Sequence, residues 1–256
     1  MQSVAVIVPT HNEAGNLPAL VDRLAAVDLG GRLHGVVVVD DASTDGTPEV
    51  AAALARRGVP AVRLLARPAR HGLGSAYRAG FAAALLLPTD AFVQMDADLS
   101  HAPEAIPSLL AALEAGADVA LGSRWVPGGS VDARWPIGRR ILSRFANGAL
   151  LPLLLGTRQA DPTSGFRAFT RRALEAIDVP GKTRCDGYAF QVETLCAAVA
   201  CGLRVAEVPI RFEERRDGRS KLDAATKAVA LREILALGLR DRAGRRSLQR
   251  RGVATK

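Results

Sequence analysis

Aromatic, histidine and cysteine residues are scarce in this chain of 256 residues. Phe, Trp and Tyr together make up 4% of the sequence, so we expect a core of Ala, Val, Leu and Ile within a hydrophobic content of 48%. The four histidines indicate no Ser/His/Asp or Cys/His arrangement, and there is no zinc pattern. The three cysteines include no C-x-x-C pair, which predicts reduced thiols in a cytosolic protein.

Membrane-spanning and targeting segments are also missing. No uninterrupted apolar run reaches the roughly 18 residues that a helix needs to span a bilayer. The two closest runs are GALLPLLLG (148–156) and AVALREILALGL (228–239), and Arg232 and Glu233 interrupt the second. The N-terminus has no basic region and no small-residue cleavage site, so we expect no signal peptide. We predict a cytoplasmic protein that does not cross a membrane by itself but lies at its inner face.

Positive charge is in excess, with a net charge of +8 and a pI near 10.2. This balance favours anionic partners, such as nucleic acid, phosphate-rich ligands or an anionic membrane surface. We do not expect nucleic acid, because no basic stripe is interleaved with aromatic residues. The length suits one large domain, or one domain followed by a tail.

Short strand patterns alternate with helical patterns in the first half of the chain. Strands are expected at 4–9, 35–41, 61–67, 91–96 and 118–124, with helices between them. This alternation predicts an open α/β sheet, mostly parallel, with helices on both faces. A further strand pattern at 204–214 indicates that the sheet is mixed. In such sheets ligands bind beyond the carboxyl ends of the strands, where polar residues cluster in this sequence.

Asp96 and Asp98 stand at the end of a hydrophobic run, separated by one residue. Hard divalent cations prefer carboxylate oxygens, and Mg²⁺ commonly combines one or two carboxylates with substrate phosphates. The alternative is a solvated turn in which the aspartates act as caps, and the position at a strand end favours the metal. His101 follows as a weaker candidate, either a metal ligand or a packing residue.

A second acidic group, DDASTDGT, follows the strand expected at 35–41. Asp41 is suited to accept hydrogen bonds from a nucleobase or ribose. Asp45 to Thr47 are expected to form the turn, and Thr47 to cap the following helix. The glycines of GLGSAYRAG (72–80) do not match G-x-G-x-x-G, because position 77 is Tyr. Helix packing is therefore favoured there over phosphate binding.

Ten motifs occur in order along the chain, among them VIVPTHNEAGNL, VVVVDDASTDGT, MDADLSHAPE, DPTSGFRAF and RRDGRSKL. Together they resemble the polyprenol (dolichol) phosphate mannose synthase branch of glycosyltransferase family 2, over residues 4–237. The resemblance implies a single-domain GT-A fold, which we assign to residues 1–237, followed by a basic tail at 238–256. It also implies transfer of mannose from GDP-mannose to a polyprenyl phosphate, with inversion and with Mg²⁺ or Mn²⁺.

The resemblance assigns roles on the donor side. Pro9, Thr10 and Glu13 resemble the first nucleotide-binding element, and Asp41 resembles the residue under the guanosine. Because the acceptor is already an anionic phosphate, the reaction needs no strong general base, which agrees with the scarcity of histidine. Glucose as the transferred sugar stays an alternative, and so does a requirement for a membrane-anchoring partner protein.

Metal and phosphate roles follow from the same resemblance. Asp96 and Asp98 resemble the metal-binding pair, and Asp161 resembles an acceptor-side element. Ser100 stands where some archaeal members carry a glutamine as a further metal ligand, so a hydroxyl or a water is expected there. Four basic residues in or beside loops are similar to those that hold donor and acceptor phosphates: Arg124, Arg139, Arg215 and Lys221. Taken singly, each would more ordinarily be a surface charge.

Two segments are suited to a membrane surface. The stretch GRRILSRFANGALLPLLLG (138–156) is first basic and then apolar, and the C-terminal helical pattern ends in an Arg-rich tail. Both can lie on a bilayer with arginines toward lipid phosphates. Ordinary packing of both helices against the rest of the chain is the alternative.

Overall fold

A seven-stranded sheet lies at the centre of the part of the chain that the structure describes, in the order β3-β2-β1-β4-β7-β5-β8. The structure is a computed structural model and describes residues 3–58, 60–214, 226 and 228–238. The strands are β1 (Val4–Thr10), β2 (Leu33–Asp41), β3 (Val62–Arg67), β4 (Ala91–Gln94), β5 (Val119–Ser123), β7 (Arg167–Thr170) and β8 (Val205–Pro209). β7 is antiparallel to β4 and β5, and the other pairs of this sheet are parallel. The prediction of a mixed, mostly parallel sheet is confirmed.

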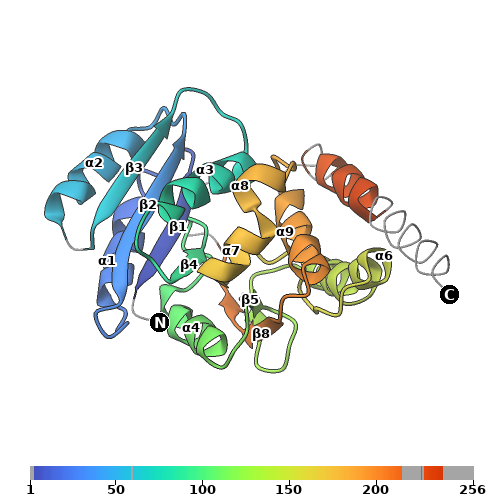
Figure 1. Cartoon of the computed structure of the whole chain (residues 1–256). Coiled ribbons are helices and arrows are strands. Elements are labelled where there is room, and N and C mark those ends of the chain that lie inside the picture. Colours follow the sequence, from blue (N-terminus) through green and yellow to red (C-terminus); the bar gives the residue numbers. More distant parts are fainter. Residues whose placement is uncertain (1–2, 59, 215–225, 227, 239–256) are drawn as a thin grey trace.

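Helices cover both faces of the sheet (Figure 1). One face carries α1 (Leu17–Ala26), α2 (Thr47–Arg57) and α4 (Ile106–Glu114), and the other carries α3 (Leu73–Leu85), α7 (Arg171–Ile177), α8 (Val179–Lys182) and α9 (Ala189–Ala200). Alternate residues of β1 enter the two cores: Val4, Val6 and Val8 on the first side, Ala5 and Ile7 on the second. Burial on both sides explains why the strand sequences are continuously apolar.

α3 packs against the sheet at unusually close range. A Cβ on Gly80 would lie 2.5 Å from Cγ2 of Ile7 in β1. A Cβ on Gly74 would collide with the carbonyl oxygen of Cys185 and lie 2.8 Å from Cβ of Phe190. These two glycines therefore serve helix packing, as favoured from the sequence.

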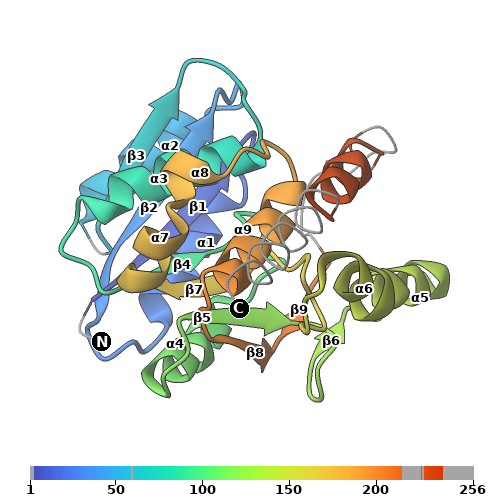
Figure 2. The same cartoon turned by 45° about the vertical axis from the view of Figure 1, so that its right-hand side comes forward.

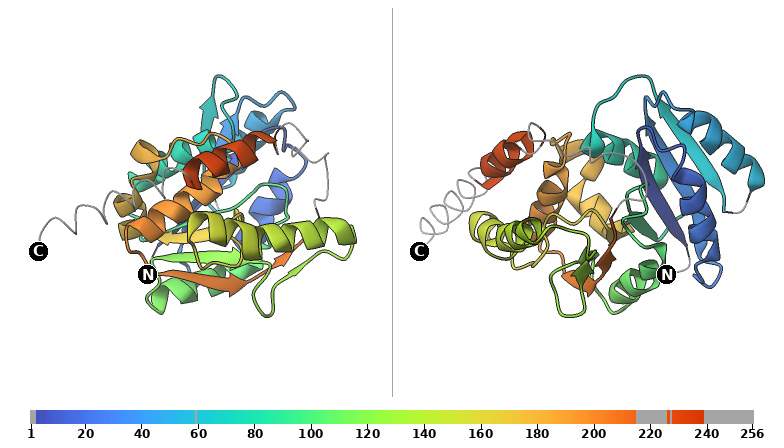
Figure 3. Two further views of the ribbon diagram at one scale, coloured as in Figure 1. Left: turned by 90° about the vertical axis from the view of Figure 1, so that its right-hand side faces the viewer. Right: turned by 180° about the vertical axis from the view of Figure 1, so that it is seen from behind.

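The second half of the chain adds a long helical rod. α5 (Ile137–Phe145), the π-helical turn η2 (Ala146–Leu150) and α6 (Leu151–Leu155) follow one another without a break. This rod lies at the end of the molecule opposite to α2 (Figures 1 and 3). The short strands β6 (Ser130–Val131) and β9 (Arg211–Phe212) pair separately, and η1 (Pro103–Ala105) precedes α4.

The helical residues 228–238 lie beside α6 and α9 (Figure 2). Ile234 joins the core cluster that contains Leu155 and Phe190. A Cβ on Gly238 would lie 2.9 Å from Cγ of Leu154, which shows how closely the two helices approach. Within the described residues, no helix combines the length and the apolar character that crossing a membrane requires.

The predicted helix cap at Thr47 is wrong. Gly46 holds the cap position with φ of 88°, and Thr47 is the first helical residue of α2. The Thr47 hydroxyl instead accepts a hydrogen bond from the N–H of Glu13 at 2.9 Å and donates to Asp45 at 2.5 Å. Thr47 therefore ties the turn after β2 to the segment after β1, which lines the site described next.

Candidate active site

Two adjoining cavities open at the carboxyl ends of β1 and β4, where the strand order reverses direction. The first has a volume of about 180 Å³, and its walls include Pro9, Thr10, Glu13 and Asp41. The second has a volume of about 320 Å³, and its walls include Ser100, His101, Arg124 and Arg139. The two share four lining residues: Leu73, Asp96, Asp98 and Tyr188. The aspartate pair therefore stands at the junction of the two cavities.

Both aspartates are held by neighbouring hydroxyls. Oδ1 of Asp98, which is 3% exposed, accepts from the Ser100 hydroxyl at 2.6 Å and from the Ser100 N–H at 3.1 Å. Oδ1 of Asp96 accepts from the hydroxyl of Tyr77 at 3.0 Å. Burial and the charge of Asp96 raise the pKa of Tyr77 well above its ordinary value, so Tyr77 remains a donor. These hydrogen bonds fix the orientation of both carboxyl groups.

His101 packs behind this pair. Its Nδ1 accepts from the N–H of Asp96 at 3.1 Å, and its ring stacks on Phe166 with centroids 5.1 Å apart. Burial lowers the pKa of His101, so the ring is neutral and carries its proton on Nε2. Nδ1 is thus engaged with the main chain, which supports the packing role over the metal-ligand role.

The donor set fits a divalent cation that shares its coordination with a ligand. Among the described residues, no group of three or more His, Cys, Asp and Glu side chains is arranged to hold a metal ion. Two carboxylates, Asp96 and Asp98, are what Mg²⁺ or Mn²⁺ needs when substrate phosphates and waters supply the other oxygens. The Ser100 hydroxyl lies within this set through its bond to Asp98.

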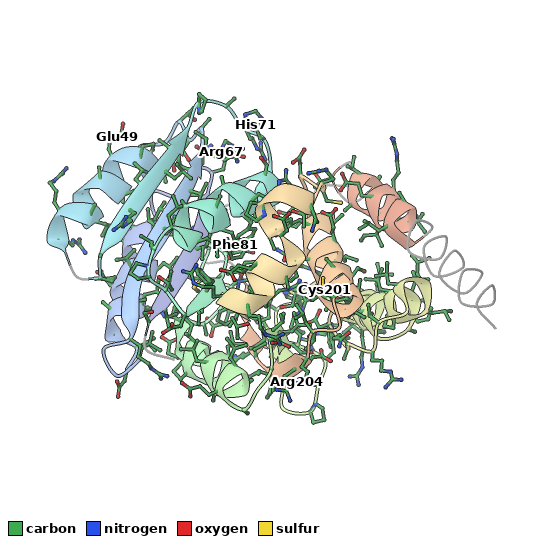
Figure 4. All side chains as sticks on the ribbon, viewed as in Figure 1. Glu49, Arg67, His71, Phe81, Cys201 and Arg204 are labelled. Atoms are coloured by element: carbon green, nitrogen blue, oxygen red, sulfur yellow. The ribbon has the colours of Figure 1, made fainter. Side chains whose placement is uncertain are left out.

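Asp41 fixes one wall of the first cavity. Its carboxylate accepts from the N–H groups of His71 and Gly72, at 3.1 and 2.9 Å, and pairs with Nη1 of Arg67 at 2.8 Å. Figure 4 shows Arg67 and His71 together at this loop. Asp41 therefore both lines the cavity and holds the loop whose Gly72 lines it as well.

Basic side chains line the second cavity. Arg124 forms a two-pronged pair with Asp161, Nε to Oδ2 at 2.7 Å and Nη2 to Oδ1 at 2.6 Å, and Asp161 is fully buried. The Arg139 guanidinium lies 3.8 Å from the ring centroid of Trp135 and 3.6 Å from Glu214. The structure thus brings together the predicted Arg124, Arg139 and Asp161. Arg215 and Lys221 lie outside the described residues.

The lining residues that were not singled out from the sequence include Trp135, Tyr188 and Gln191. Trp135 is 5% exposed and also meets Phe212 edge-on, with centroids 5.6 Å apart. Its position two residues before a basic helix could have indicated it, since the chain has only two tryptophans. Tyr188 and Gln191 belong to an apolar helical stretch, and nothing in their spacing distinguishes them.

Comparisons with known proteins identify the family of this chain. Residues 5–178 match the family model of glycosyl transferase family 2. The chain is 42% identical to a polyprenol monophosphomannose synthase of Mycolicibacterium smegmatis, over 95% of this chain and 90% of that protein. It is 41% identical to an undecaprenyl-phosphate mannosyltransferase of Micrococcus luteus, over 92% and 94% of the two chains.

Solved structures confirm the fold. A glucosyl-3-phosphoglycerate synthase of Mycobacterium tuberculosis, in complex with Mn²⁺, UDP-glucose and phosphoglyceric acid, matches with a TM-score of 0.69 at 22% identity. The match covers 94% of this chain and 79% of that one. The predicted GT-A architecture is confirmed, and the chain belongs to glycosyl transferase family 2 as a glycosyltransferase.

Proposed function

We propose that this glycosyltransferase transfers mannose from GDP-mannose to a polyprenyl phosphate, with inversion and with a divalent cation. The names of its two relatives support mannose and a polyprenyl phosphate as the substrates. The observation that carries the proposal is the position of Asp96 and Asp98 at the junction of two cavities, one with Glu13 and Asp41 in its walls and one with Arg124 and Arg139. A diphosphate bridging that junction would have the sugar on the basic side.

In the first cavity we assign the nucleotide to Pro9, Thr10, Glu13 and Asp41. Asp41 offers a negatively charged edge to the N–H groups of a base, beside the loop that it already holds. Glu13 is fixed by the N–H of Asn16's side chain, which donates to Oε2 at 2.7 Å, and by the Thr47 contact. These bonds hold the donor side in place before any ligand binds.

In the proposed reaction, an oxygen of the acceptor phosphate attacks the anomeric carbon. A carbon–oxygen bond forms there as the bond to the diphosphate oxygen breaks. When bound, Mg²⁺ or Mn²⁺ on Asp96 and Asp98, with Ser100 beside them, would neutralise charge on the leaving diphosphate.

The protein's own contribution is to hold two anions close together. Arg124 and Arg139 place guanidinium groups at the walls of the second cavity, where they offset phosphate charge. Two hydrogen bonds to Asp161 restrict movement of the Arg124 guanidinium. Arg215 and Lys221 remain predictions for the same task.

We also propose that the enzyme lies on the inner face of a membrane, through the rod α5–α6. α5 has no buried residue, and four of its apolar side chains are 61–74% exposed: Ile137, Ile141, Leu142 and Phe145. Arg140 and Arg144 lie on the same helix, which suits anionic headgroups. Residues 228–238 pack against the chain through the buried Ile234, and the half-exposed Leu231 and Leu235 are suited to a membrane surface.

The metal assignment is tested by transfer of labelled mannose with and without EDTA. Asp96→Ala and Asp98→Ala should each abolish transfer, because each removes half of the carboxylate pair. Asp22→Ala is the matched control, since Asp22 is a surface aspartate with a side chain 65% exposed. Unchanged turnover in EDTA, or in Asp98→Ala, contradicts the metal assignment.

A further inference from the structure

A chain of hydrogen bonds connects the exposed rod to the second cavity. Asn147 lies in the π-helical turn η2 and is only 3% exposed, although α5 next to it has no buried residue. Its Nδ2 donates to the carbonyl of Ser143 at 2.9 Å. Its Oδ1 accepts from the hydroxyl of Thr163 at 2.8 Å and from the Thr163 N–H at 3.3 Å.

Thr163 carries the connection onward. Its hydroxyl oxygen accepts from Nη2 of Arg124 at 3.0 Å, while Asp161, two residues earlier, holds the same guanidinium. Two hydrogen bonds therefore separate the side chain of Asn147 from the guanidinium of Arg124. Thr163 and Arg124 both line the second cavity, whereas Asn147 does not.

We propose that Asn147 is a positioning residue that transmits the placement of the rod α5–α6 on a lipid surface to Arg124. The inference rests on the proposed function, because it predicts that Asn147 affects binding of the lipid phosphate and not binding of the nucleotide sugar. The π-helical turn supports this role, since such turns inside α-helices occur frequently at functional sites. It turns the Asn147 amide inward at the end of α5, a helix that has no buried residue.

The donor side is tied to other parts of the chain. Asp41 is bonded to the loop of His71 and Gly72, and Glu13 to Thr47, and none of these contacts involves the rod. The hydrogen-bond route from the rod to Arg124 therefore does not pass through these donor-side contacts. Displacements of about 1 Å in a positioned group are enough to change turnover by about a hundredfold.

Steady-state kinetics with both substrates test the proposal. Asn147→Ala should raise the KM for polyprenyl phosphate about tenfold, by leaving Thr163 and Arg124 unfixed, and should leave the KM for GDP-mannose unchanged. Ser143→Ala is the control, because it removes only a 3.4 Å contact and keeps the main-chain acceptor. Equal changes in both KM values, with intact folding, would overturn the proposal.

Thr163 provides a second variant with a conservative rescue. Thr163→Val removes the shared hydroxyl and should reproduce the effect of Asn147→Ala, while Thr163→Ser should restore the wild-type value. If Thr163 acts through Asn147, the double variant Asn147→Ala/Thr163→Val is no worse than either single variant. Additive effects mean that Thr163 touches substrate independently, and they overturn the coupling.

Hydrogen exchange gives a readout that needs no sugar transfer. Anionic phospholipid vesicles should slow exchange of the N–H groups of Thr163 and Arg124 in the wild type, because these bond to Asn147 and Asp161. Asn147→Ala should abolish this slowing. An absence of slowing in the wild type overturns the inference, whereas slowing without any mannose transfer contradicts only the proposed function.

Discussion

The hydroxyl of Tyr77 donates a hydrogen bond to Oδ1 of Asp96 at 3.0 Å. Tyr77 lies in α3 and is fully buried, and its ring stacks on Phe190 with centroids 5.7 Å apart. A helix on one face of the sheet therefore orients a carboxylate at the end of β4. The close approach of α3, which its glycines permit, is what brings this hydroxyl to the aspartate.

Tyr77→Phe should lower the affinity for the metal ion without changing the fold. The ring and its stacking remain, but Asp96 loses its donor, and such outer contacts are worth about tenfold or more in metal affinity. The measurement is the Mn²⁺ concentration that gives half-maximal transfer. Thr89→Val is the control. It also removes a buried hydroxyl, but Thr89 precedes the first residue of β4, whereas Asp96 follows the last. An unchanged Mn²⁺ requirement in Tyr77→Phe contradicts this role.

Asp161→Asn should destabilise the protein strongly. The substitution leaves the Arg124 guanidinium, 11% exposed, without its anionic partner, and such losses cost about 3–5 kcal/mol. Asp22→Asn makes the same chemical change in the exposed pair with Arg57 and should cost less than about 1 kcal/mol. Urea unfolding of both variants measures the difference, and equal costs would argue against a buried pair.

Leu142→Ser should weaken binding to anionic vesicles. Leu142 is 69% exposed on α5, and loss of a leucine from a buried contact removes about 1.5–3 kcal/mol, or about tenfold or more in affinity. Leu86→Ser is the matched control, since Leu86 is 87% exposed at the end of α3, away from the rod. Flotation with liposomes separates the two. Equal binding of both variants to the liposomes would contradict a membrane contact through α5.

Glu233→Gln should stabilise the protein at neutral pH. Burial, together with Asp186 and Glu193, raises the pKa of Glu233 above its ordinary value of 4.5. The folded state then holds a proton that the unfolded state releases. The contribution of Glu233 to stability is therefore fully present below pH 4.5 and is lost as pH rises through the folded pKa. Thermal unfolding of the two proteins should differ at pH 7 and converge at pH 4. A variant less stable than wild type at pH 7 contradicts the assignment.

Local patterns were sufficient to predict the sheet and its polar edge. Continuous valines placed β2, and the hydrophobic run before Asp96 placed β4, because buried parallel strands need apolar residues on both faces. Since parallel strands end at one edge, Asp41 and Asp96 were expected at the same edge of the sheet. This is why the position of these aspartates at the carboxyl ends of the strands could be predicted, whereas their roles remain predictions.

The pairing of Arg124 with Asp161 could not be predicted from such patterns. The two residues are 37 positions apart and meet only because β7 enters antiparallel between β4 and β5. Periodicity identifies a strand but does not give its place or direction in a sheet. The inward amide of Asn147 was equally hidden, because it depends on a π-helical turn inside an amphipathic stretch.

The central claim is tested most directly by a donor panel with purified protein, a polyprenyl phosphate and Mn²⁺. GDP-mannose, GDP-glucose, UDP-glucose and UDP-galactose are offered in parallel, and the lipid product is identified by mass and by anomeric configuration. We predict that GDP-mannose alone yields product and that this product is β-linked mannosyl polyprenyl phosphate. Asp98→Ala should yield no product. Product from UDP-glucose but not from GDP-mannose would contradict the proposed function.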